Sequence, residues 1–533
     1  MPKPKSALSP NFSIKRTVRK PSARSKGGIV VTQNRMASEA GARVLKEGGH
    51  AVDAAVAAAM TVGVAEPWMS GIGGVGAMLV YEAKTGKIRA FDGGGRSPKT
   101  LRPEDYALTG DADAGNLFGW AMVKGNINTV GPKAVIAPTQ PALLALAHKH
   151  YGTKRWRDLL KPAIALAEEG LPVDWHTAVA IGAAMKDLQK DPGARERFLP
   201  GGLPPYITAN ADPRPIGRLP CPSLAKTLKA IAADGASALY KGALAKTIAD
   251  DVRAMGGYLS EDDLAAVAPP ELEPLKISYL DRTIHVLPEL NGGPTLAVAF
   301  RELQKLRKKP DAKLNAKTFV AYAGAMQAAW KHRFKVMGDA GEKTAPTSTT
   351  HISVVDREGN MVTLTQTLLT LFGARIVLPQ SGILMNNGIN WFDPTPGGPN
   401  SIAADARALA NYVPAVMTGG DSTIAIGGCG GRRILPAVFQ LLAMSADFGF
   451  DLDEAFHEPR LDISNVSPVI IDRRLPQKTI DALTETYKSV IGEPVEFPSN
   501  FTIAGAVRRS RGRNEGATEP HHPWSEAVSE DEV

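Results

Sequence analysis

Residues 349–367 read TTHISVVDREGNMVTLTQT. Two runs rich in β-branched residues flank a three-residue connection that ends in Gly359. This pattern predicts a β-hairpin, because β-branched residues favour strands and glycine supplies the left-handed conformation that a short connection requires. We therefore expect β-strands to predominate from Thr349 onward.

The register of this hairpin follows from its turn. If Asp356 pairs with Asn360, Thr349 lies opposite Thr367. Directly opposed residues hold their Cβ atoms about 4.5 to 5.5 Å apart on one face, so two hydroxyl groups can meet, and a bulge would shift this only slightly. Thr–Thr pairs are common in ordinary sheets, so the pairing alone favours a structural role for both residues.

A second feature is the glycine pair Gly430-Gly431. Residues 423–426 predict a strand before it, and a helix is expected from Arg432 onward. The pair would therefore stand at a helix N-terminus, where backbone N–H groups have no partner within the helix. Tight strand-to-helix turns also favour Gly-Gly, so without further context the pair indicates a structural role and not a catalytic one.

The remainder of the chain mixes helical and strand patterns. Residues 28–33 predict a short strand, and 37–67 predict a helical segment broken at Gly48-Gly49. Residues 77–81 form an apolar run of strand type, and 140–260 are mostly helical in pattern.

The glycine-rich segment SGIGGVG, residues 70–76, formally matches the G-x-G-x-x-G pattern of dinucleotide-binding folds. In those folds the pattern follows a strand and opens a helix. Here it follows a helical segment and opens a strand, so the order is reversed. We interpret the glycines as positions of close backbone packing and expect no cofactor.

The composition excludes several classes of function. The 533 residues are 44% hydrophobic and 22% charged, and no apolar run reaches the roughly 18 to 20 residues of a membrane span. Residues 1–28 carry eight Lys or Arg residues and no acid, which accounts for the whole net charge of +8. Such an arm is typical of a disordered, solvated tail, and we expect no binding to nucleic acid or membrane.

Other residues bear on compartment and metal content. The arm lacks the apolar stretch of a secretory signal peptide, so a cytoplasmic location is predicted. Cys221 and Cys429 are far apart in sequence and are interpreted as buried free thiols. His521 and His522 are neighbours without the spacing of a metal-binding motif, and no metal is expected.

Several segments, taken in order, resemble the gamma-glutamyltransferase family. They are GGHAVDAAVAA (48–58), EP (66–67) with SGIGG (70–74), LAKTL (224–228) with YKG (240–242), GGYL (256–259) with DDL (262–264), NGG (291–293), TTH (349–351) with SVVD (353–356), GILMNN (382–387) and GG (430–431). Only the basic arm falls clearly outside the resemblance.

The resemblance implies an α+β fold of the N-terminal-nucleophile hydrolase type, a four-layer αββα sandwich. It also implies a proenzyme that is cut between Ser348 and Thr349, so that residues 29–348 form a large subunit and 349–533 a small catalytic subunit. The free α-amine of Thr349 then acts as a base toward its own hydroxyl, which attacks an amide carbonyl and forms an acyl-enzyme. The mature protein is expected to be a heterodimer of its own two fragments.

The same resemblance assigns roles to three more residues. Thr367 matches the family's second threonine and is expected to hydrogen-bond the Thr349 hydroxyl. Gly430 and Gly431 are expected to offer backbone N–H groups to the oxyanion, a contribution of typically a few kcal/mol.

The positions that hold a glutamyl donor in the family are not matched in this chain. The position of the family's arginine is occupied by Gly94, with Arg96 two residues further on, and that of its asparagine by Leu369. The positions of its amide and carboxylate are occupied by Gly388 and Trp391, with Asn390 next to Trp391. The positions of its two serines are occupied by Ala410 and Asn411. Nearly every partner of a charged α-amino and α-carboxylate group is thereby removed, and burying such charges unpaired would cost several kcal/mol. The candidate substrate-binding residues are therefore Arg96, Leu369, Asn390, Trp391 and Asn411. Arg96, Arg407, Arg432 and Arg433 are candidate carboxylate binders, although a surface or structural ion pair is the favoured interpretation of each.

Three hypotheses about function follow. The leading one is an amidohydrolase that acts on a small acyl amide, with or without a carboxylate. The second is a genuine gamma-glutamyltransferase or glutathione hydrolase with an altered donor site. The third is a catalytically silent family member that serves as a binding module, and a denaturing gel tests it, because a silent protein needs no cut.

Overall fold

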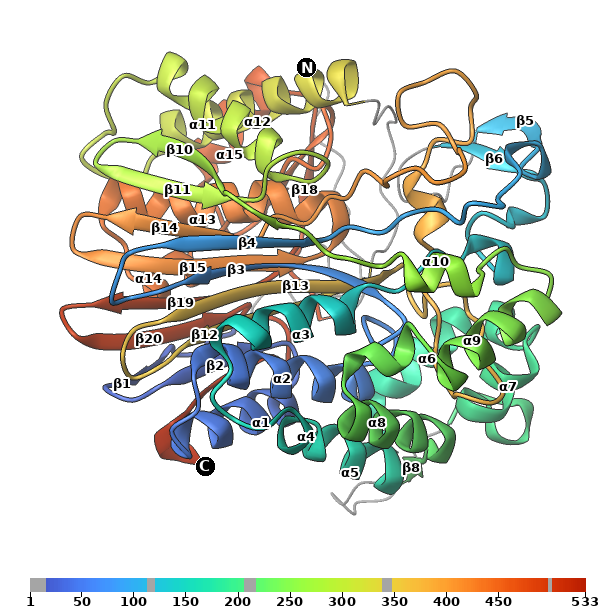
Figure 1. Ribbon diagram of the computed structural model, residues 1–533. Coiled ribbons are helices and arrows are strands. Elements are labelled where there is room, and N and C mark those ends of the chain that lie inside the picture. The colour runs from blue at the N-terminus through green and yellow to red at the C-terminus, as the bar shows by residue number, and fades with distance from the viewer. Residues whose placement is uncertain (1–15, 113–119, 206–216, 338–347, 497–500) are drawn as a thin grey trace.

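Figure 1 shows the computed structural model, which describes residues 16–112, 120–205, 217–337, 348–496 and 501–533. Two sheets of seven antiparallel strands form its centre. The first sheet contains, in spatial order, β21 (Glu526–Ser529), β2 (Ile29–Thr32), β12 (Ser348–Val355), β13 (Met361–Leu369), β3 (Val75–Tyr81), β4 (Ile88–Gly93) and β9 (Glu271–Leu272). The second contains β1 (Ala23–Ser25), β20 (Arg513–Thr518), β19 (Ile503–Ser510), β15 (Ser422–Cys429), β14 (Ala415–Gly419), β11 (Arg282–Val286) and β10 (Leu275–Tyr279).

Helices cover the outer face of each sheet, which makes four layers (Figure 1). The helices outside the first sheet are α1 (Arg35–Lys46), α2 (Ala51–Ala65) and α3 (Gln140–Tyr151), and those outside the second are α11 (Gly293–Leu306), α13 (Ile434–Phe448) and α12 (Ala316–Val336), which packs against α11. Apolar side chains from both inner faces, such as Val75 and Val507, form a further cluster between the sheets. The predicted α+β class and its αββα arrangement are confirmed.

The layer outside the first sheet is built around α2, whose sequence AVDAAVAAAMTVGVA consists mainly of small residues. Nearly every residue of α2 is buried, because α1, α3, β12 and β13 surround it. A helix that is apolar all round is typical of one enclosed by the protein, and small side chains allow its neighbours to approach closely. His50 and Asp53 form the capping box that begins the helix.

The remaining elements lie at the edges of the sandwich. The segment after α3 is mostly helical, as predicted for residues 140–260, and it contains α4 (Trp156–Leu159), α5 (Lys161–Glu169), α6 (Trp175–Leu188), α7 (Pro192–Phe198), α8 (Pro222–Asp234), α9 (Ala243–Ala254) and α10 (Glu261–Ala265). The C-terminal part adds α14 (Leu452–His457), α15 (Gln477–Thr486) and a small sheet of β16 (Leu461–Asp462), β17 (Val469–Asp472) and β18 (Ser489–Gly492). Two short strand pairs complete the structure, β5 (Leu108–Ala112) with β6 (Ala121–Val123) and β7 (Leu171–Pro172) with β8 (Arg218–Leu219).

The expectation of a disordered arm over residues 1–28 is wrong for residues 16–28, the part of the arm that the structure describes. Strand β1 pairs with β20 at the edge of the second sheet. The Lys20 ammonium donates to the backbone carbonyl of Ser525 at 2.7 Å, and Arg24 forms an ion pair with Asp451 at 2.8 Å. The arm is ordered because its basic side chains have partners several hundred residues further along the chain.

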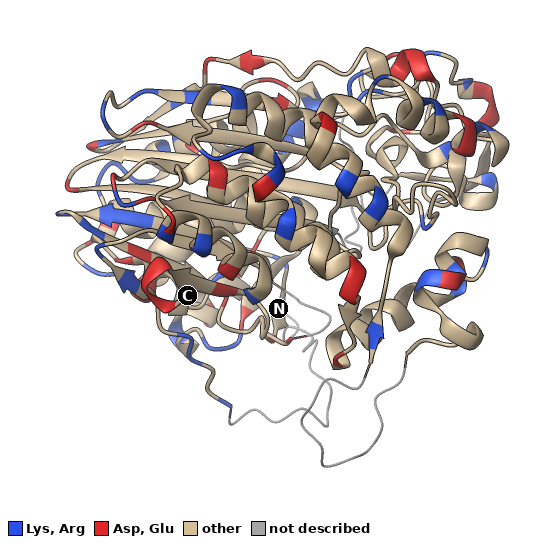
Figure 2. Ribbon diagram, turned by 60° about the horizontal axis from the view of Figure 1, so that its bottom comes forward, with Lys and Arg blue, Asp and Glu red and all other residues tan. Residues whose placement is uncertain are grey.

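Figure 2 shows Lys and Arg interspersed with Asp and Glu along the helices and loops of the visible face. Within the described ranges, none of the helices has both the length and the apolar composition needed to cross a membrane.

The two sheets approach each other closely where His351 of β12 faces Gly427 of β15. A Cβ atom at Gly427 would lie 2.3 Å from Cε1 of the His351 ring. At Gly505 in the neighbouring strand β19, a Cβ atom would lie 3.7 Å from Cδ2 of the same ring. The buried imidazole therefore fits between the sheets because the facing strands carry glycine.

Substitution of Gly427 by alanine tests this close approach. We expect Gly427→Ala to lower the free energy of unfolding by about 1 to 3 kcal/mol, because the added methyl group overlaps a buried ring. Gly182→Ala is the matched control, since Gly182 lies in α6 with open space around its Cβ position and alanine there should stabilise by about 0.5 to 1 kcal/mol. Denaturant titration measures both changes, and a Gly427→Ala protein as stable as the wild type would contradict the close contact.

Candidate active site

The hairpin at the centre of the first sheet has the predicted register over most of its length. Pairs run from Val355 with Met361 to Thr350 with Gln366. The turn is closed by Gly359, whose φ is +94°, and its N–H donates to the Asp356 carbonyl at 3.1 Å. The local sequence pattern was therefore sufficient to define this part of the ladder.

The end of the ladder differs from the simple pairing. Ser348 pairs with Leu369 and Thr350 with Gln366, so the register shifts between them, and the single residue Thr349 lies opposite both Thr367 and Leu368, which places the extra residue of the bulge in β13. A bulge leaves one residue unpaired and redirects its side chain. Thr349 is nevertheless buried next to Thr367, with 5% and 2% of their respective surfaces exposed.

The two threonine hydroxyls are in contact. Thr349 Oγ1 donates to Thr367 Oγ1 at 3.3 Å, and Thr367 Oγ1 also accepts the backbone N–H of Leu369 at 2.8 Å. Leu369 has a φ of +87°, in the left-handed region that costs a non-glycine residue about 1 to 3 kcal/mol. The two hydroxyls thus lie beside the strained backbone of Leu369, and the hydrogen bond to Thr367 Oγ1 helps to stabilise that conformation.

A row of polar side chains continues from this pair into the interior. The His351 ring bonds through Nδ1 to Thr365 Oγ1 at 3.0 Å and through Nε2 to Ser353 Oγ at 2.9 Å. Thr363 Oγ1 donates across the sandwich to the carbonyl of Ile426 at 2.9 Å. Burial lowers the pKa of His351 to about 3, so the ring is neutral at ordinary pH. Sequence reasoning did not single out this row, although its members alternate in the two strands and so share one face.

The glycine pair lies at a strand-to-helix turn, as predicted. Strand β15 ends at Cys429, Gly430 and Gly431 have φ values of +127° and +59°, and the 3-10 helix η7 (Gly431–Arg433) leads into α13. Along β15, Ile426 faces Thr363 and Gly427 faces His351. The strand therefore runs toward the Thr349 end of the row as it approaches Gly430.

The glycine-rich turn 70–74 borders the hydroxyl pair from the other side. It joins α2 to β3, so the predicted order of helix, glycine-rich turn and strand is confirmed. A Cβ atom at Gly74 would lie 2.4 Å from the carbonyl oxygen of Thr367, and one at Gly73 would lie 2.2 Å from that of Leu384. The interpretation of these glycines as positions of close backbone packing is confirmed.

Three of the residues aligned with the glutamyl-binding positions lie together and are apolar. Leu369, Trp391 and Ala410 are buried in the cluster between the sheets, with Trp391 in the short helix η6 (Gly388–Trp391). The Trp391 ring meets the Tyr412 ring edge to face, with centroids 6.4 Å apart. This part of the site is therefore continuous with the core of the sandwich.

The two asparagines among the candidates are buried beside this cluster. The backbone carbonyl of Asn390 accepts the indole N–H of Trp120 at 3.3 Å. Asn411 Oδ1 accepts from Arg333 at 2.8 Å, and the fully buried Arg333 also donates to the Ala410 carbonyl at 2.9 Å. The oxygen of the Asn411 side chain is thus engaged by a structural arginine.

The four candidate arginines have different surroundings. Arg96 is half-exposed and pairs with Asp405 at 3.3 Å. Arg407 bonds to Asp92 at 2.8 Å and to Glu289 at 2.6 Å, and its Nη2 atom lies 3.8 Å from the position a Cβ atom would take at Gly94. Both arginines line a cavity of about 160 Å³. Arg433 lies 3.4 Å from Asp462, and Arg432 lies over the Trp330 and Phe334 rings.

Cysteine and histidine residues give no sign of a metal centre. Cys221 and Cys429 are buried free thiols, as predicted. Over the described part of the chain, no three His, Cys, Asp or Glu residues are grouped as metal ligands.

The chain is similar to known proteins in family, sequence and structure. The family model described as gamma-glutamyltranspeptidase matches residues 37–347 and 340–528. The chain is 31% identical to the glutathione hydrolase proenzyme of Bacillus subtilis (strain 168), over 90% of this chain and 88% of that protein. It is 30% identical to the acylase ACY 1 proenzyme of Pseudomonas sp. (strain SE83), over 92% of this chain and 93% of that protein. The crystal structure of cephalosporin acylase from Bacillus halodurans superposes with a TM-score of 0.81 at 24% identity, covering 98% of this chain and 99% of that one, which shows a shared fold.

The buried His351 predicts a specific pH dependence of stability. The unfolded imidazole takes up a proton near its ordinary pKa of about 6.5, whereas the folded one does so only near 3, so the unfolded state binds more protons between these values. This contribution to stability is therefore complete above about pH 6.5 and is lost as the pH falls toward 3. We expect His351→Gln to reduce the slope of unfolding free energy against pH by up to about 1.4 kcal/mol per pH unit in this window. Denaturant titrations at several pH values measure the slope, and equal slopes for the two proteins would contradict the prediction.

Proposed function

The chain belongs to the gamma-glutamyltranspeptidase (gamma-glutamyltransferase) family, and from this membership we propose that it is a self-cleaving amidohydrolase whose nucleophile is Thr349. Membership makes it an enzyme of the N-terminal-nucleophile hydrolase class, with hydrolase or transferase activity. The observation that carries the proposal is the 3.3 Å contact of the Thr349 and Thr367 hydroxyls at the start of β12, opposite the bulge in β13.

Maturation begins with attack of Thr349 Oγ1 on the carbonyl carbon of Ser348. The amide bond between the two residues breaks as an ester to the Thr349 oxygen forms, and the hydroxyl proton passes to the released amine. Water then hydrolyses the ester, which leaves a carboxylate on Ser348 and both a free amine and a free hydroxyl on Thr349. The register shift supports this step, because the ladder is irregular opposite the bond to be cut.

Turnover uses the same hydroxyl with the new amine as its base. The amine takes the Thr349 hydroxyl proton, and the oxygen attacks the substrate amide carbon. Backbone N–H groups of Gly430 and Gly431 stabilise the oxyanion, and the protonated amine gives its proton to the leaving nitrogen. Water then attacks the acyl-enzyme with the amine again as base and releases the acid. Thr367 keeps the nucleophile oriented, since its oxygen accepts from both Thr349 and the Leu369 N–H.

The fold supports a stable heterodimer after the cut. In the first sheet, β2, β3, β4 and β9 come from residues before Thr349, whereas β21, β12 and β13 come from the part that begins at the cleavage site; β2 lies between β21 and β12, and β13 pairs with β3. In the second sheet, β10, β11 and β1 of the N-terminal part flank four strands of the C-terminal part. The fragments of 29–348 and 349–533 therefore share both sheets and cannot separate without breaking them. The cytoplasmic location of this heterodimer stays a prediction.

The cleavage site can be tested by comparing two neighbouring threonines. We expect the wild type to yield a fragment that begins at Thr349, Thr349→Ala to remain uncut and inactive, and Thr350→Ala to retain cleavage, activity or both. The reason is that Thr350 pairs in the ladder with Gln366 while Thr349 meets Thr367. A denaturing gel with N-terminal sequencing reads the result.

Two outcomes would contradict this assignment. A wild-type protein that is fully folded but uncut would contradict the self-cleavage mechanism and favour the hypothesis of a catalytically silent binding module. An essential Thr350 with a dispensable Thr349 would place the nucleophile one residue later.

The donor pocket supports a substrate without an α-amino group. Leu369, Trp391 and Ala410 offer no hydrogen-bond partner through their side chains, apart from the indole N–H of Trp391, and they are packed in the core. A zwitterion in such surroundings would lose its hydration without compensation. We propose that the substrate is the amide of a simple mono- or dicarboxylic acid, and the relative named acylase is consistent with this class.

A genuine glutathione hydrolase is the second candidate function. It is favoured by the similar identity, 31%, to the Bacillus subtilis protein of that name. Arg407 would then be the group available to the α-carboxylate, because it lies beside the position that the family's arginine would occupy at Gly94.

Matched amides distinguish the two functions. We expect the kcat/KM of a glutaryl anilide to exceed that of the γ-glutamyl anilide by at least about tenfold. The reason is that the α-amino group of the glutamyl compound would be left without a hydrogen-bond partner in the site. Arg407→Gln should lower the preference for glutaryl over butyryl anilide more than Arg96→Gln does, since Arg407 Nη2 lies 3.8 Å from the position of a Cβ atom at Gly94. A clear preference for the glutamyl compound would show that the chain holds a glutamyl donor by other residues. A larger effect of Arg96→Gln would restore Arg96 as the carboxylate binder.

A further inference from the structure

Leu369, the last residue of β13, links the strained backbone to the hydroxyl pair, because its N–H group donates to Thr367 Oγ1 at 2.8 Å. A left-handed conformation in a non-glycine residue persists only where surrounding contacts enforce it. Contacts of this kind act on both neighbours of Leu369, and a single residue, Asn387, supplies them.

Asn387 binds the chain on either side of Leu369. Its backbone N–H donates to the Leu368 carbonyl at 3.1 Å, and its Oδ1 atom accepts the Thr370 N–H at 3.2 Å. Its Nδ2 atom donates to Thr370 Oγ1 at 2.7 Å and to the Thr129 carbonyl at 2.9 Å. The residue is fully buried, so water does not compete for these bonds. Leu369 is thus held from both sides by one asparagine.

The local sequence does not require these contacts of Asn387. The residue precedes the short helix η6, a position at which asparagine usually accepts an N–H group of its own helix. Here the side chain makes no such capping bond. Its hydrogen bonds go instead to Thr370, 17 residues earlier in the chain, and to Thr129, which precedes the proposed cut.

The effect of Asn387 reaches the hydroxyl pair through Leu369. A hydroxyl oxygen has two acceptor positions, and the Thr349 hydroxyl and the Leu369 N–H match both positions at Thr367 Oγ1. If Leu369 relaxed to an ordinary strand conformation, its N–H would turn away, and Thr367 would lose one of the two donors that fix its orientation. A misplacement of about 1 Å at reacting groups lowers a rate by as much as about 100-fold.

We propose that Asn387 is a positioning residue that holds Leu369 in its left-handed conformation and thereby orients the Thr367 and Thr349 hydroxyls. It acts through Leu369 and is not itself proposed to contact the substrate. The proposal rests on the proposed role of Thr349 as the nucleophile, but the conformation of Leu369 can be tested without that role.

A matched control lies at the turn end of the same hairpin. Asn514 in β20 is 1% exposed, and its Nδ2 atom donates to the carbonyls of Gly27 at 2.8 Å and Asp356 at 3.0 Å. Its Oδ1 atom accepts from Arg509 at 2.9 Å. Alanine at Asn514 therefore removes the same kinds of contact as alanine at Asn387, but far from the two threonine hydroxyls.

Self-cleavage measures the effect without any choice of substrate. The full-length wild type and its variants are synthesised by cell-free translation, and the two fragments are followed with time on a denaturing gel. We expect Asn387→Ala to slow cleavage at least about tenfold, because the nucleophile loses its orientation, and Asn514→Ala to stay within about threefold of the wild type. Denaturant titration should show that both variants lose stability.

Relief of strain at Leu369 provides a rescue that a general loss of stability does not predict. Glycine adopts the left-handed conformation about as readily as the right-handed one, so Leu369→Gly reduces the need for enforcement by Asn387. The double variant Asn387→Ala/Leu369→Gly should therefore cleave at least about threefold faster than Asn387→Ala, although it lacks a further buried side chain.

Amide hydrogen exchange reports the conformation of Leu369 directly. The Leu369 N–H is bonded to Thr367 in the folded protein and should exchange slowly. The measurement is made in the Thr349→Ala background, which keeps all variants uncut, by mass spectrometry with fragmentation that resolves single amides. We expect Asn387→Ala to speed exchange of the Leu369 amide at least about tenfold, and Asn514→Ala to leave it unchanged.

Three results would overturn the proposal. They are cleavage in Asn387→Ala that is no slower than in Asn514→Ala, a double variant that cleaves more slowly than Asn387→Ala, and exchange of the Leu369 amide that Asn387→Ala leaves unchanged. A wild type that folds and is not cut would instead contradict the role of Thr349, and the exchange measurement would then decide the role of Asn387.

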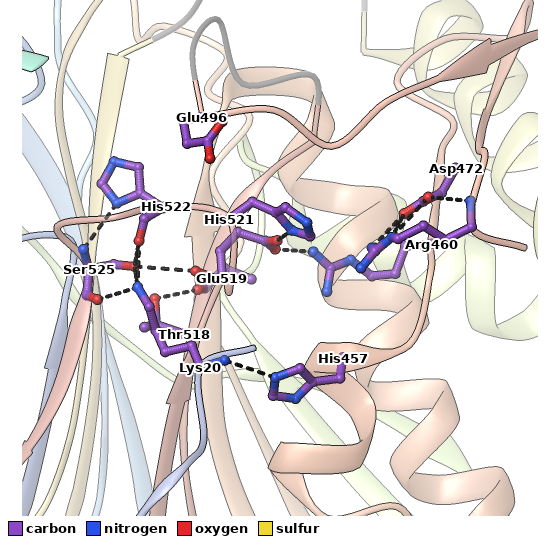
Figure 3. A network of polar contacts seen from close by, with 12 residues as sticks. Lys20, His457, Arg460, Asp472, Glu496, Thr518, Glu519, His521, His522 and Ser525 are labelled. Atoms are coloured by element: carbon purple, nitrogen blue, oxygen red, sulfur yellow. Dashed lines mark hydrogen bonds and ion pairs between the residues drawn. The ribbon is translucent and has the colours of Figure 1, made fainter. Parts of the chain in front are cut away.

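A second pair of variants serves if Asn387→Ala does not fold. Thr370→Val removes the hydroxyl that accepts from Asn387 and keeps the shape of the side chain. Thr518→Val is its control, because the Thr518 hydroxyl donates to the Ala504 carbonyl at 3.1 Å and belongs to a different buried network, the one around Lys20 that Figure 3 shows. Slower cleavage in Thr370→Val than in Thr518→Val supports the proposal, and equal rates would overturn it.

Discussion

The polar contact between the two sheets over the β12–β13 hairpin is the constraint on which the rest of the structure depends. His351, Ser353 and Thr363 bond to one another or to carbonyls of the facing sheet. Hydrogen bonds are directional, so this row fixes how the sheets lie against each other, whereas a purely apolar contact tolerates sliding. Because the row ends at Thr349 and Thr367, the alignment of the sheets also sets the position of the two hydroxyls.

Strain is concentrated at the end of that row. Ser348 pairs with Leu369, the register shifts beside Thr349, and Leu369 has a left-handed backbone. Such features persist only where surrounding contacts enforce them. Here the close packing of Gly74 against the Thr367 carbonyl and the bond from the Leu369 N–H to Thr367 supply the enforcement. The bond proposed to break thus lies in the least regular part of an otherwise regular sheet.

The apolar residues Leu369, Trp391 and Ala410 form an extension of the sandwich core toward this end. Leu369 and Trp391 belong to the same buried cluster as strand residues of both sheets. Arg333, fully buried, engages Asn411 and the Ala410 carbonyl, so a position that could face a ligand serves the packing of α12 instead.

The sequence by itself determined the local structure of this protein. The hairpin register from Thr350 to Val355, the turn at Gly430 and Gly431, and the helix-to-strand order around 70–76 depend on backbone preferences of adjacent residues, which can be identified along the chain. The four-layer arrangement came from resemblance to a family, not from periodicity.

Only the tertiary structure decided the bulge opposite Thr349, the ordering of residues 16–28 and the partners of Arg96 and Arg407. Each of these depends on groups from distant parts of the chain, such as Asp92 for Arg407 and Ser525 for Lys20. The physical reason is that backbone conformation is governed mainly by near neighbours, whereas the charge, burial and orientation of a side chain are set by whatever the fold brings against it.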